Sequence, residues 1–215
     1  MIDPNSPRAA MIRCAADLIA RNGVAGTSIG DVLAAAGAAR GSVYYHFPGG
    51  RAELMREAVY HGGEELGAEL NSARRLPLRT AVPAVAQVWR RRLLASDFAA
   101  GCPVGAGAQC RDTDPTAADA ATEVFLQWRH LLAARLREED FDDRRADELA
   151  DAILTAIEGA VVLCRARRSV APIDTAVGHL LELLERRRST AAEEAERAKT
   201  DDDFARRPAA TDPLG

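Results

Sequence analysis

The sequence predicts an all-α protein, in which an N-terminal three-helix helix-turn-helix domain precedes a C-terminal helical bundle. Apolar residues recur at helical spacing in successive segments, and no segment shows the alternation of a half-buried strand. Alanine, the residue with the highest helix propensity, is abundant throughout. Hydrophobic residues make up 47% of the 215 residues, which is enough to form the core of one large or two small domains.

The first helix should begin at Ser6 and Pro7, because serine is a suitable N-cap and proline is favoured at the first helical position. Asn22 and Gly23 are expected to end it. Its apolar residues share one face, which should pack behind the next two helices: Met11, Ile12, Ala15, Leu18 and Ile19.

Two short helices are expected next. Ser28 is a suitable N-cap for the first of them, and Gly37 matches the glycine that commonly follows a helix. The apolar residues between them lie on one face: Ile29, Val32, Leu33 and Ala36. The second helix should run from near Ala39 to about His46. Two short helices joined by a tight glycine-containing turn predict a helix-turn-helix, whose second helix enters the DNA major groove.

The second short helix carries groups suited to DNA contact. Arg40 offers a bidentate fork for guanine, and Gly41 lets the backbone approach closely. Val43 and Phe47 should face inward and so hold the polar residues outward. Further contacts, mostly with phosphates, are expected from side chains at the start of the first short helix and along the second short helix: Thr27, Ser28, Ser42, Tyr44, Tyr45 and His46.

A longer helix should run from about Arg51 to Asn71 and join the two domains, before a break at residues 74–77. The next expected helix spans 78–96 and contains Pro83, so it should start nearer Val82 or be kinked. Residues 99–110 are rich in small side chains and should form a short helix with loops.

Asp114 begins a further helix that should reach about Glu138, and a charged connection at residues 140–145 follows it. Residues 146–167 are expected to form a helix that is apolar nearly all round. Pro172 should begin the last regular helix. Two strongly apolar helices in succession suggest a dimer interface built as a four-helix bundle, with these residues in it: Ile153, Ile157, Val161, Ile173, Val177, Leu180, Leu181 and Leu184.

The few aromatic residues of the second domain have two interpretations. Plain core packing is one, and the lining of a ligand cavity between helices is the other. Under the second, the expected ligand-binding residues are Trp89, Phe98, Cys102, Phe125 and Trp128. Gly159 should permit close helix approach, and a cavity-facing role for the neighbouring Glu158 is a weaker interpretation.

The charge and cysteine content bound the function. The net charge is −4, and residues 1–57 hold six arginines against five acidic residues, so DNA binding must depend on a few placed contacts. The four cysteines lack metal-ligand spacing, and no metal or cofactor is expected. With no apolar N-terminal region or membrane-spanning stretch, a reduced cytoplasmic protein is expected.

Residues 35–47 read AAGAARGSVYYHF, and Arg51 and Leu54 follow. This stretch resembles the DNA-binding domain of the tetracycline-repressor (TetR) family of bacterial transcription regulators. Ala39 departs from the family's usual serine, which should weaken capping by about 1 kcal/mol. FPGGR at residues 47–51 and GCPV at residues 101–104 resemble the LmrA/YxaF-like subgroup. The resemblance adds Arg51 to the expected DNA contacts.

The resemblance implies a homodimeric repressor that binds a palindromic DNA operator and is released by a small, mostly apolar effector. Its domains would be residues 1–57 for DNA, residues 58–188 for ligand and dimerisation, and a disordered tail at residues 189–215. A thiol-based redox sensor using Cys102 and Cys110 is the alternative on the same scaffold. A small helical enzyme is the third reading; no nucleophile pattern accompanies His46, so we expect no enzyme.

Overall fold

The computed structural model describes residue 3, residues 6–73 and residues 75–185, and every regular element in that part of the chain is a helix. An all-α fold is therefore confirmed. The helices, in order, are α1 (Pro7–Asn22), α2 (Ile29–Ala36), α3 (Ser42–His46), α4 (Gly50–Ala73), α5 (Leu78–Ala95), α6 (Pro103–Ala108), α7 (Pro115–Arg137), α8 (Asp143–Arg167) and a final helical stretch over residues 171–185. The predicted tail lies outside the described residues.

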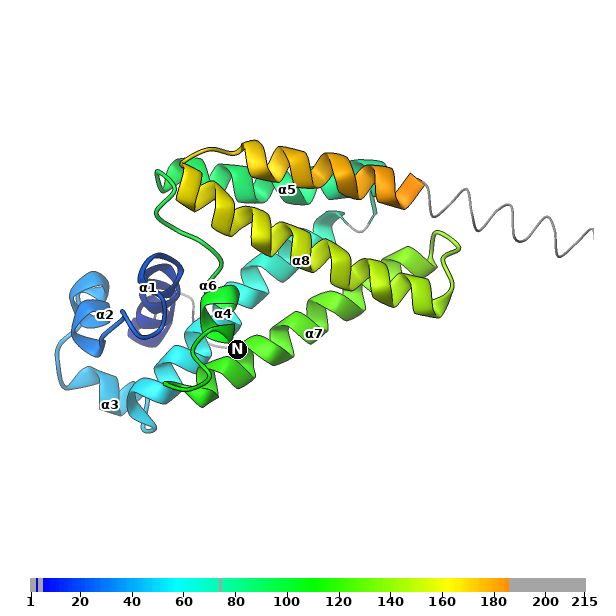
Figure 1. Cartoon of the computed structure of the whole chain (residues 1–215). Coiled ribbons are helices and arrows are strands. Elements are labelled where there is room, and N and C mark those ends of the chain that lie inside the picture. The colour runs from blue at the N-terminus through cyan, green and yellow to red at the C-terminus, as the bar shows by residue number, and fades with distance from the viewer. Residues whose placement is uncertain (1–2, 4–5, 74, 186–215) are drawn as a thin grey trace, which may run out of the picture.

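The helices form two groups that share α4. The first three helices cluster at one end of the molecule, and α4 leads from this cluster into the larger bundle (Figure 1). There α4 packs along α7, and α7 packs along α8. The α5 helix and residues 171–185 lie beyond α8, where Arg90 forms an ion pair with Asp174 (Figure 1). The short α6 contacts α1, α4 and α7, so it lies where the two groups meet.

Local capping signals set the N-terminal helix ends as predicted. The Ser6 side chain accepts a hydrogen bond from the Ala9 N–H at 3.2 Å, with Pro7 at the first helical position. Ser28 and Asp31 form a reciprocal capping box at the start of α2. Gly37 ends that helix with a left-handed φ of 63°, a conformation that glycine adopts without steric cost.

The N-terminal core holds α3 from behind. Val43 is 1% exposed and Phe47 is fully buried, so the expected inward face of α3 is confirmed. The Arg8 guanidinium lies 4.9 Å from the centre of the Phe47 ring and covers it from the side of α1. The short helix is therefore fixed by apolar anchors on one side, and its other side remains in solvent.

Glycines on α4 bring the helices of the larger bundle close to it. A Cβ on Gly62 would lie 2.4 Å from Pro103 of α6, and one on Gly63 would lie 2.6 Å from Val124 of α7. Both distances are too short for a side chain, so the two glycines permit the contact. The close approach that the sequence assigned to Gly159 is wrong within this chain, because a Cβ there would meet nothing within 4 Å.

Two predicted helix starts need correction. The α3 helix begins at Ser42 and not near Ala39, because the Ala39 carbonyl accepts hydrogen bonds from the Ser42 N–H and hydroxyl and closes a turn first. The α8 helix begins at Asp143, earlier than predicted, because Asp142 caps it by accepting from the Arg145 N–H at 2.9 Å. Both starts are set by side-chain hydrogen bonds to the local backbone.

The α5 helix begins at Leu78, in agreement with the predicted range of 78–96, and includes Pro83, so the alternative start near Val82 is wrong. Proline removes the hydrogen bond to the carbonyl four residues earlier, that of Arg79. Arg79 is exposed, so water can satisfy its carbonyl. Among the described residues, no helix has the length and apolarity that crossing a membrane requires.

Candidate functional site

The surface of α3 carries two unusually exposed aromatic rings. Tyr44 is 65% exposed and Tyr45 is 83% exposed, although large aromatic side chains are mostly buried in folded proteins. Their hydroxyls can reach solvent, and the ring of Tyr45 packs edge-on against His46 at 5.0 Å between centroids. Such an exposed aromatic surface on a well-anchored helix fits a contact with another molecule.

The turn before α3 completes this surface. Arg40 and Gly41 are both exposed and lie in the non-helical turn that leads into the helix. Ser42 is partly buried, and its hydroxyl donates to the Ala39 carbonyl at 2.7 Å, so it holds the turn in shape. Arg40 therefore has a free fork of N–H donors beside the exposed end of α3, which is the arrangement a guanine edge requires.

The structure does not support the predicted phosphate contact from Thr27. Its side chain is 1% exposed, and its hydroxyl donates to the Gly23 carbonyl at 2.8 Å. The Ser28 hydroxyl is exposed but already bonded to Asp31 at 2.6 Å. Hydrogen bonds from Ser28 lower the pKa of Asp31, so this carboxylate stays charged at the start of α2, where it opposes a phosphate.

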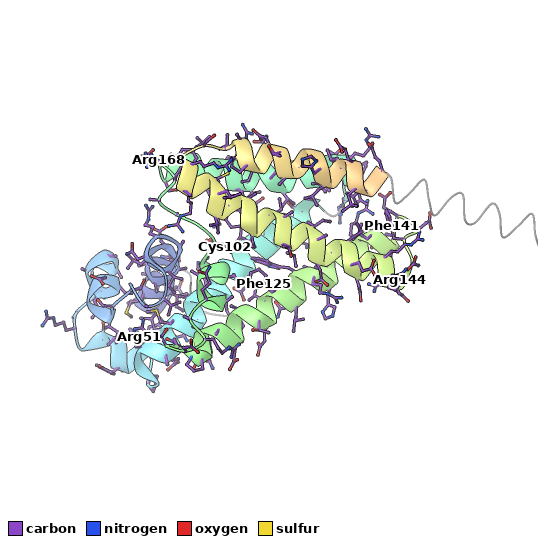
Figure 2. All side chains as sticks on the ribbon, viewed as in Figure 1. Arg51, Cys102, Phe125, Phe141, Arg144 and Arg168 are labelled. Carbon is purple, nitrogen blue, oxygen red and sulfur yellow. The ribbon has the colours of Figure 1, made fainter. Side chains whose placement is uncertain are left out.

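Arg51 also differs from its predicted role. Its guanidinium pairs with the Asp114 carboxylate at 2.9 Å and donates to the carbonyls of Val24 at 2.5 Å and Thr27 at 3.2 Å. Arg51 thus joins the start of α4, the connection before α2 and the N-cap of α7, at the position that Figure 2 labels. With these three partners it is not free for DNA, and we name the arrangement the Arg51 junction.

Asp114 is the buried member of the Arg51 junction. Its carboxylate is 5% exposed and also accepts from the Ala117 N–H at 3.2 Å, which caps α7. The sequence identified this cap, but the partner is 63 residues away along the chain. Only the tertiary fold brings the two together, so no local signal could have identified the pair.

The two tryptophans of the larger bundle line one small cavity. Trp89 and Trp128 face a space of ≈ 40 Å³ between α4, α5, α7 and α8. A second apolar space of ≈ 60 Å³ adjoins it and shares Val85 and Ile157. We call the two spaces the apolar cavity. Ligand sites for drug-sized molecules are usually about 300–1,000 Å³, so this cavity would have to widen to admit one.

The two phenylalanines do not line this cavity, so their predicted role in it is wrong. Phe98 lies in the connection after α5 with a left-handed φ of 60°, and the Arg168 guanidinium lies 6.0 Å from its ring. Phe125, which Figure 2 labels, packs edge-on against Trp128 with 5.5 Å between ring centroids. Helical periodicity placed both residues on plausible faces but could not show which element each face meets.

A wider space separates the first three helices from the bundle. This cleft of ≈ 520 Å³ is lined by the C-terminal end of α1, by α6 and by α8, and we call it the interdomain cleft. Cys102 and Glu158 both line it. At its rim Arg165 donates to the carbonyls of Arg21 and Ala99, at 3.0 Å and 2.9 Å, and so ties α8 to the end of α1.

The cysteines of this region fit packing better than redox chemistry. Cys102 is buried at the N-cap of α6, and its sulfur accepts from the Gly105 N–H at 3.3 Å (Figure 2). Burial raises the pKa of the Cys102 thiol well above its usual value, and burial also raises that of Cys110. Both thiols therefore stay protonated and poorly nucleophilic. The six-residue α6 between them spans about 9 Å at 1.5 Å per residue, too far for a disulfide.

Most of the residues predicted at a dimer interface pack inside the chain instead. Buried residues cannot meet a second chain, and six of the eight are buried: Ile153, Ile157, Val161, Ile173, Leu180 and Leu184. Val177 and Leu181 are partly buried. The exposed apolar groups of α8 are Val162, at 57%, and Leu163, at 46%. Helical periodicity identified the apolar face of these helices but could not show that it packs inside the chain.

Comparison with known proteins matches both halves of the chain. Residues 12–58 match the family described as bacterial regulatory proteins, tetR family. Residues 79–179 match the family described as the C-terminal domain of LmrA/YxaF-like transcriptional regulators. A solved regulatory protein TetR from Rhodobacter sphaeroides has the same fold, with a TM-score of 0.74 at 19% identity over 81% of this chain and 96% of its own.

Curated relatives cover most of the chain. An uncharacterized HTH-type transcriptional regulator of Mycobacterium tuberculosis is 39% identical over 185 residues, which span 83% of this chain and 94% of the relative. The HTH-type transcriptional regulator LmrA of Bacillus subtilis is 25% identical over 170 residues, which span 77% of this chain and 90% of LmrA.

Proposed function

The chain belongs to the TetR family of DNA-binding transcription regulators, in its LmrA/YxaF-like branch, and from this premise we propose that it is a homodimeric repressor under effector control. The observation that carries the proposal is the exposed surface of α3. Arg40 projects from the turn before α3, and Tyr44 and Tyr45 project from α3 itself, which Val43 and Phe47 anchor in the core. This is the geometry of a recognition helix that enters a major groove.

The roles on DNA follow from the chemistry of these groups. Arg40 reads a guanine through two N–H donors, and this contact sets sequence preference. The hydroxyls of Tyr44 and Tyr45 bind phosphates, which hold the helix in register without reading sequence. Since the N-terminal region is nearly neutral, these few contacts carry the binding.

Two copies of the chain pair through the outer face of α8. Val162 and Leu163 expose apolar side chains there, and Gly159 leaves room for close helix approach. Val177 and Leu181, which are partly buried in one chain, complete the interface from the following helix. A two-fold dimer of this kind presents two recognition helices to the two halves of a palindromic operator.

The effector acts on the contacts between the two helix groups. Gly62 and Gly63 pack α4 against α6 and α7, and the Arg51 junction ties α7 to the connection before α2. An effector that moves α6 or α7 therefore changes the position of the recognition helices. It can shift this equilibrium only by its difference in affinity for the two states.

Selection of DNA from a random pool tests the proposal. The purified protein should enrich a two-fold symmetric sequence whose half-sites lie about one helical turn, or a multiple of it, apart. Arg40→Ala is the matched variant and should enrich sequences that lack the preferred guanine. If the wild-type protein enriches nothing above non-specific binding, the proposal is wrong.

A thiol switch is less well supported. Cys102 and Cys110 are buried and protonated, and the helix between them keeps them apart. The predicted enzyme alternative also lacks support, since the relatives with printed functions are transcriptional regulators.

A further inference from the structure

Glu158 occupies a place that neither helix packing nor DNA binding explains. It lies in the middle of α8 and lines both the apolar cavity and the interdomain cleft. Its carboxylate therefore stands where two hollow spaces meet. A carboxylate costs free energy when it is withdrawn from water unless a cation or several N–H donors compensate it.

The described residues give Glu158 no cationic partner. Its one side-chain hydrogen bond is with the Cys102 thiol of α6. The basic groups of the interdomain cleft are engaged elsewhere, since Arg165 bonds two backbone carbonyls and Arg21 pairs with Asp17. Arg165 is also seven residues further along α8, about 10 Å at 1.5 Å per residue. The other charged groups of the apolar cavity are Glu69 of α4, which is exposed, and Arg135 of α7, which pairs with Glu139.

The protonation of Glu158 reflects this isolation. Burial raises its pKa from 4.5 to about 7, against a smaller lowering by the hydrogen bond with Cys102. Near neutral pH the group is therefore divided between the acid and the carboxylate. A protonated amine beside it would favour the carboxylate, because a charge-assisted N–H···O hydrogen bond is stronger than a neutral one.

The adjoining helix α6 approaches the carboxylate closely, and the space for such a partner lies in the interdomain cleft. A Cβ on Gly105 of α6 would lie 2.7 Å from the Glu158 Oε2 atom, so any side chain at residue 105 would press on the carboxylate. The interdomain cleft opens on this side, and its ≈ 520 Å³ falls within the usual range of ligand sites. Apolar side chains such as Ile19, Val24 and Val161 line part of it.

We propose that the effector is an organic amine, whose protonated nitrogen pairs with Glu158 and whose apolar body fills the interdomain cleft. This inference rests on the proposed effector control and names the chemical class of the effector. The bound amine touches the end of α1 as well as α6 and α8. It therefore separates the DNA-binding helices from the bundle, next to the Val24 carbonyl that Arg51 holds.

Three probes of one shape test the charge preference. They are 1-naphthylmethylamine, 1-naphthalenemethanol and 1-naphthoic acid, with binding measured by calorimetry. The wild-type protein should bind the amine at least about tenfold more tightly than the alcohol or the acid. Amine affinity should rise between about pH 6 and about pH 8 as Glu158 ionises, and binding near pH 7 should release protons to the buffer.

Glu158→Gln keeps the shape of the side chain and removes its charge. It should lower amine affinity at least about tenfold and leave alcohol affinity unchanged. Glu69→Gln is the matched control in the neighbouring cavity and should behave like the wild type. Gly105→Ala should also weaken amine binding, because its methyl group narrows the cleft at Glu158. Circular dichroism melting checks that each variant is folded.

The outcomes separate this inference from the proposed function. Equal affinity for amine and alcohol, tighter binding of the acid, no amine binding, or an unchanged amine affinity in Glu158→Gln would each overturn the amine assignment. Operator binding by the same proteins without a probe is measured in parallel. If the wild-type protein without a probe does not bind the operator, the proposed regulator function is wrong, whatever the affinities for the three probes.

Discussion

Replacement of Arg51 by methionine tests the Arg51 junction between the two parts of the molecule. Methionine keeps most of the side-chain length but removes the guanidinium. The Asp114 carboxylate, 5% exposed, then loses its cation, and the carbonyls of Val24 and Thr27 lose a donor. Breaking a buried ion pair from one side costs about 3–5 kcal/mol.

The exposure of Arg51 reduces this cost. Its side chain is 35% exposed, so water can reach part of the vacated space, and we expect a loss of about 2–3 kcal/mol. For a chain of this length the melting temperature should fall by about 4–12 °C. Asp114→Asn should cost less, about 1 kcal/mol, because asparagine still caps α7 and still accepts a hydrogen bond from Arg51.

Thermal unfolding of the two single variants and the double variant measures the coupling between the side chains. The double variant should lose less stability than the sum of the singles, by about 0.5–3 kcal/mol. Additive losses, or an unchanged melting temperature in Arg51→Met, would refute the junction. Salt titration of operator binding adds an independent check, since a lost phosphate contact would lower the slope by about one and a lost internal pair would not.

Three further predictions concern the dimer, the thiols and the Glu158 carboxylate. Val162→Arg should give monomers in sedimentation, because it places a charge on the exposed apolar face of α8, while Gln127→Arg on the exposed side of α7 should remain dimeric. Cys102→Ser should release operator no differently from the wild type after diamide treatment; a release that needs Cys102 would restore the redox hypothesis. The pKa of Glu158 is about 7 in the folded chain and 4.5 in the unfolded chain, so between these pH values the folded chain holds a proton that the unfolded chain has lost. The free energy of unfolding of the wild-type protein should therefore fall, relative to that of Glu158→Gln, as the pH rises from 4.5 to about 7. Urea unfolding of both proteins across that window measures this, and parallel curves would contradict it.

Local signals were sufficient to predict much of the fold. Ser6, Ser28 and Gly37 set helix ends through hydrogen bonds or backbone conformations that involve residues at most four positions away. Helical periodicity also identified the buried side of α3 through Val43 and Phe47. Such short-range physics is visible in a single sequence, because the interacting groups are close in the chain.

The errors came from contacts between distant segments. Ile153 and Ile157 lie on an apolar face that serves equally well as a core or as an interface, and only the position of α5 shows which it is. Thr27 and Arg51 had suitable chemistry for phosphates, but their hydrogen-bonding groups are used inside the chain. The sequence indicated only weakly that Glu158 faces a cavity, because the residues around it come from helices far away in the chain.

The most direct measurement is the binding of Arg40→Ala to the selected operator and to random DNA of the same length, over a range of salt concentrations. If Arg40 reads a base from the turn before α3, the variant should lose about 1–3 kcal/mol on the operator and much less on random DNA. The ratio of operator affinity to random-DNA affinity should therefore fall in Arg40→Ala. Tyr44→Phe should lower the affinities for operator and for random DNA about equally. A wild-type ratio of operator to random affinity in Arg40→Ala would contradict the assignment of this surface as the site that reads DNA.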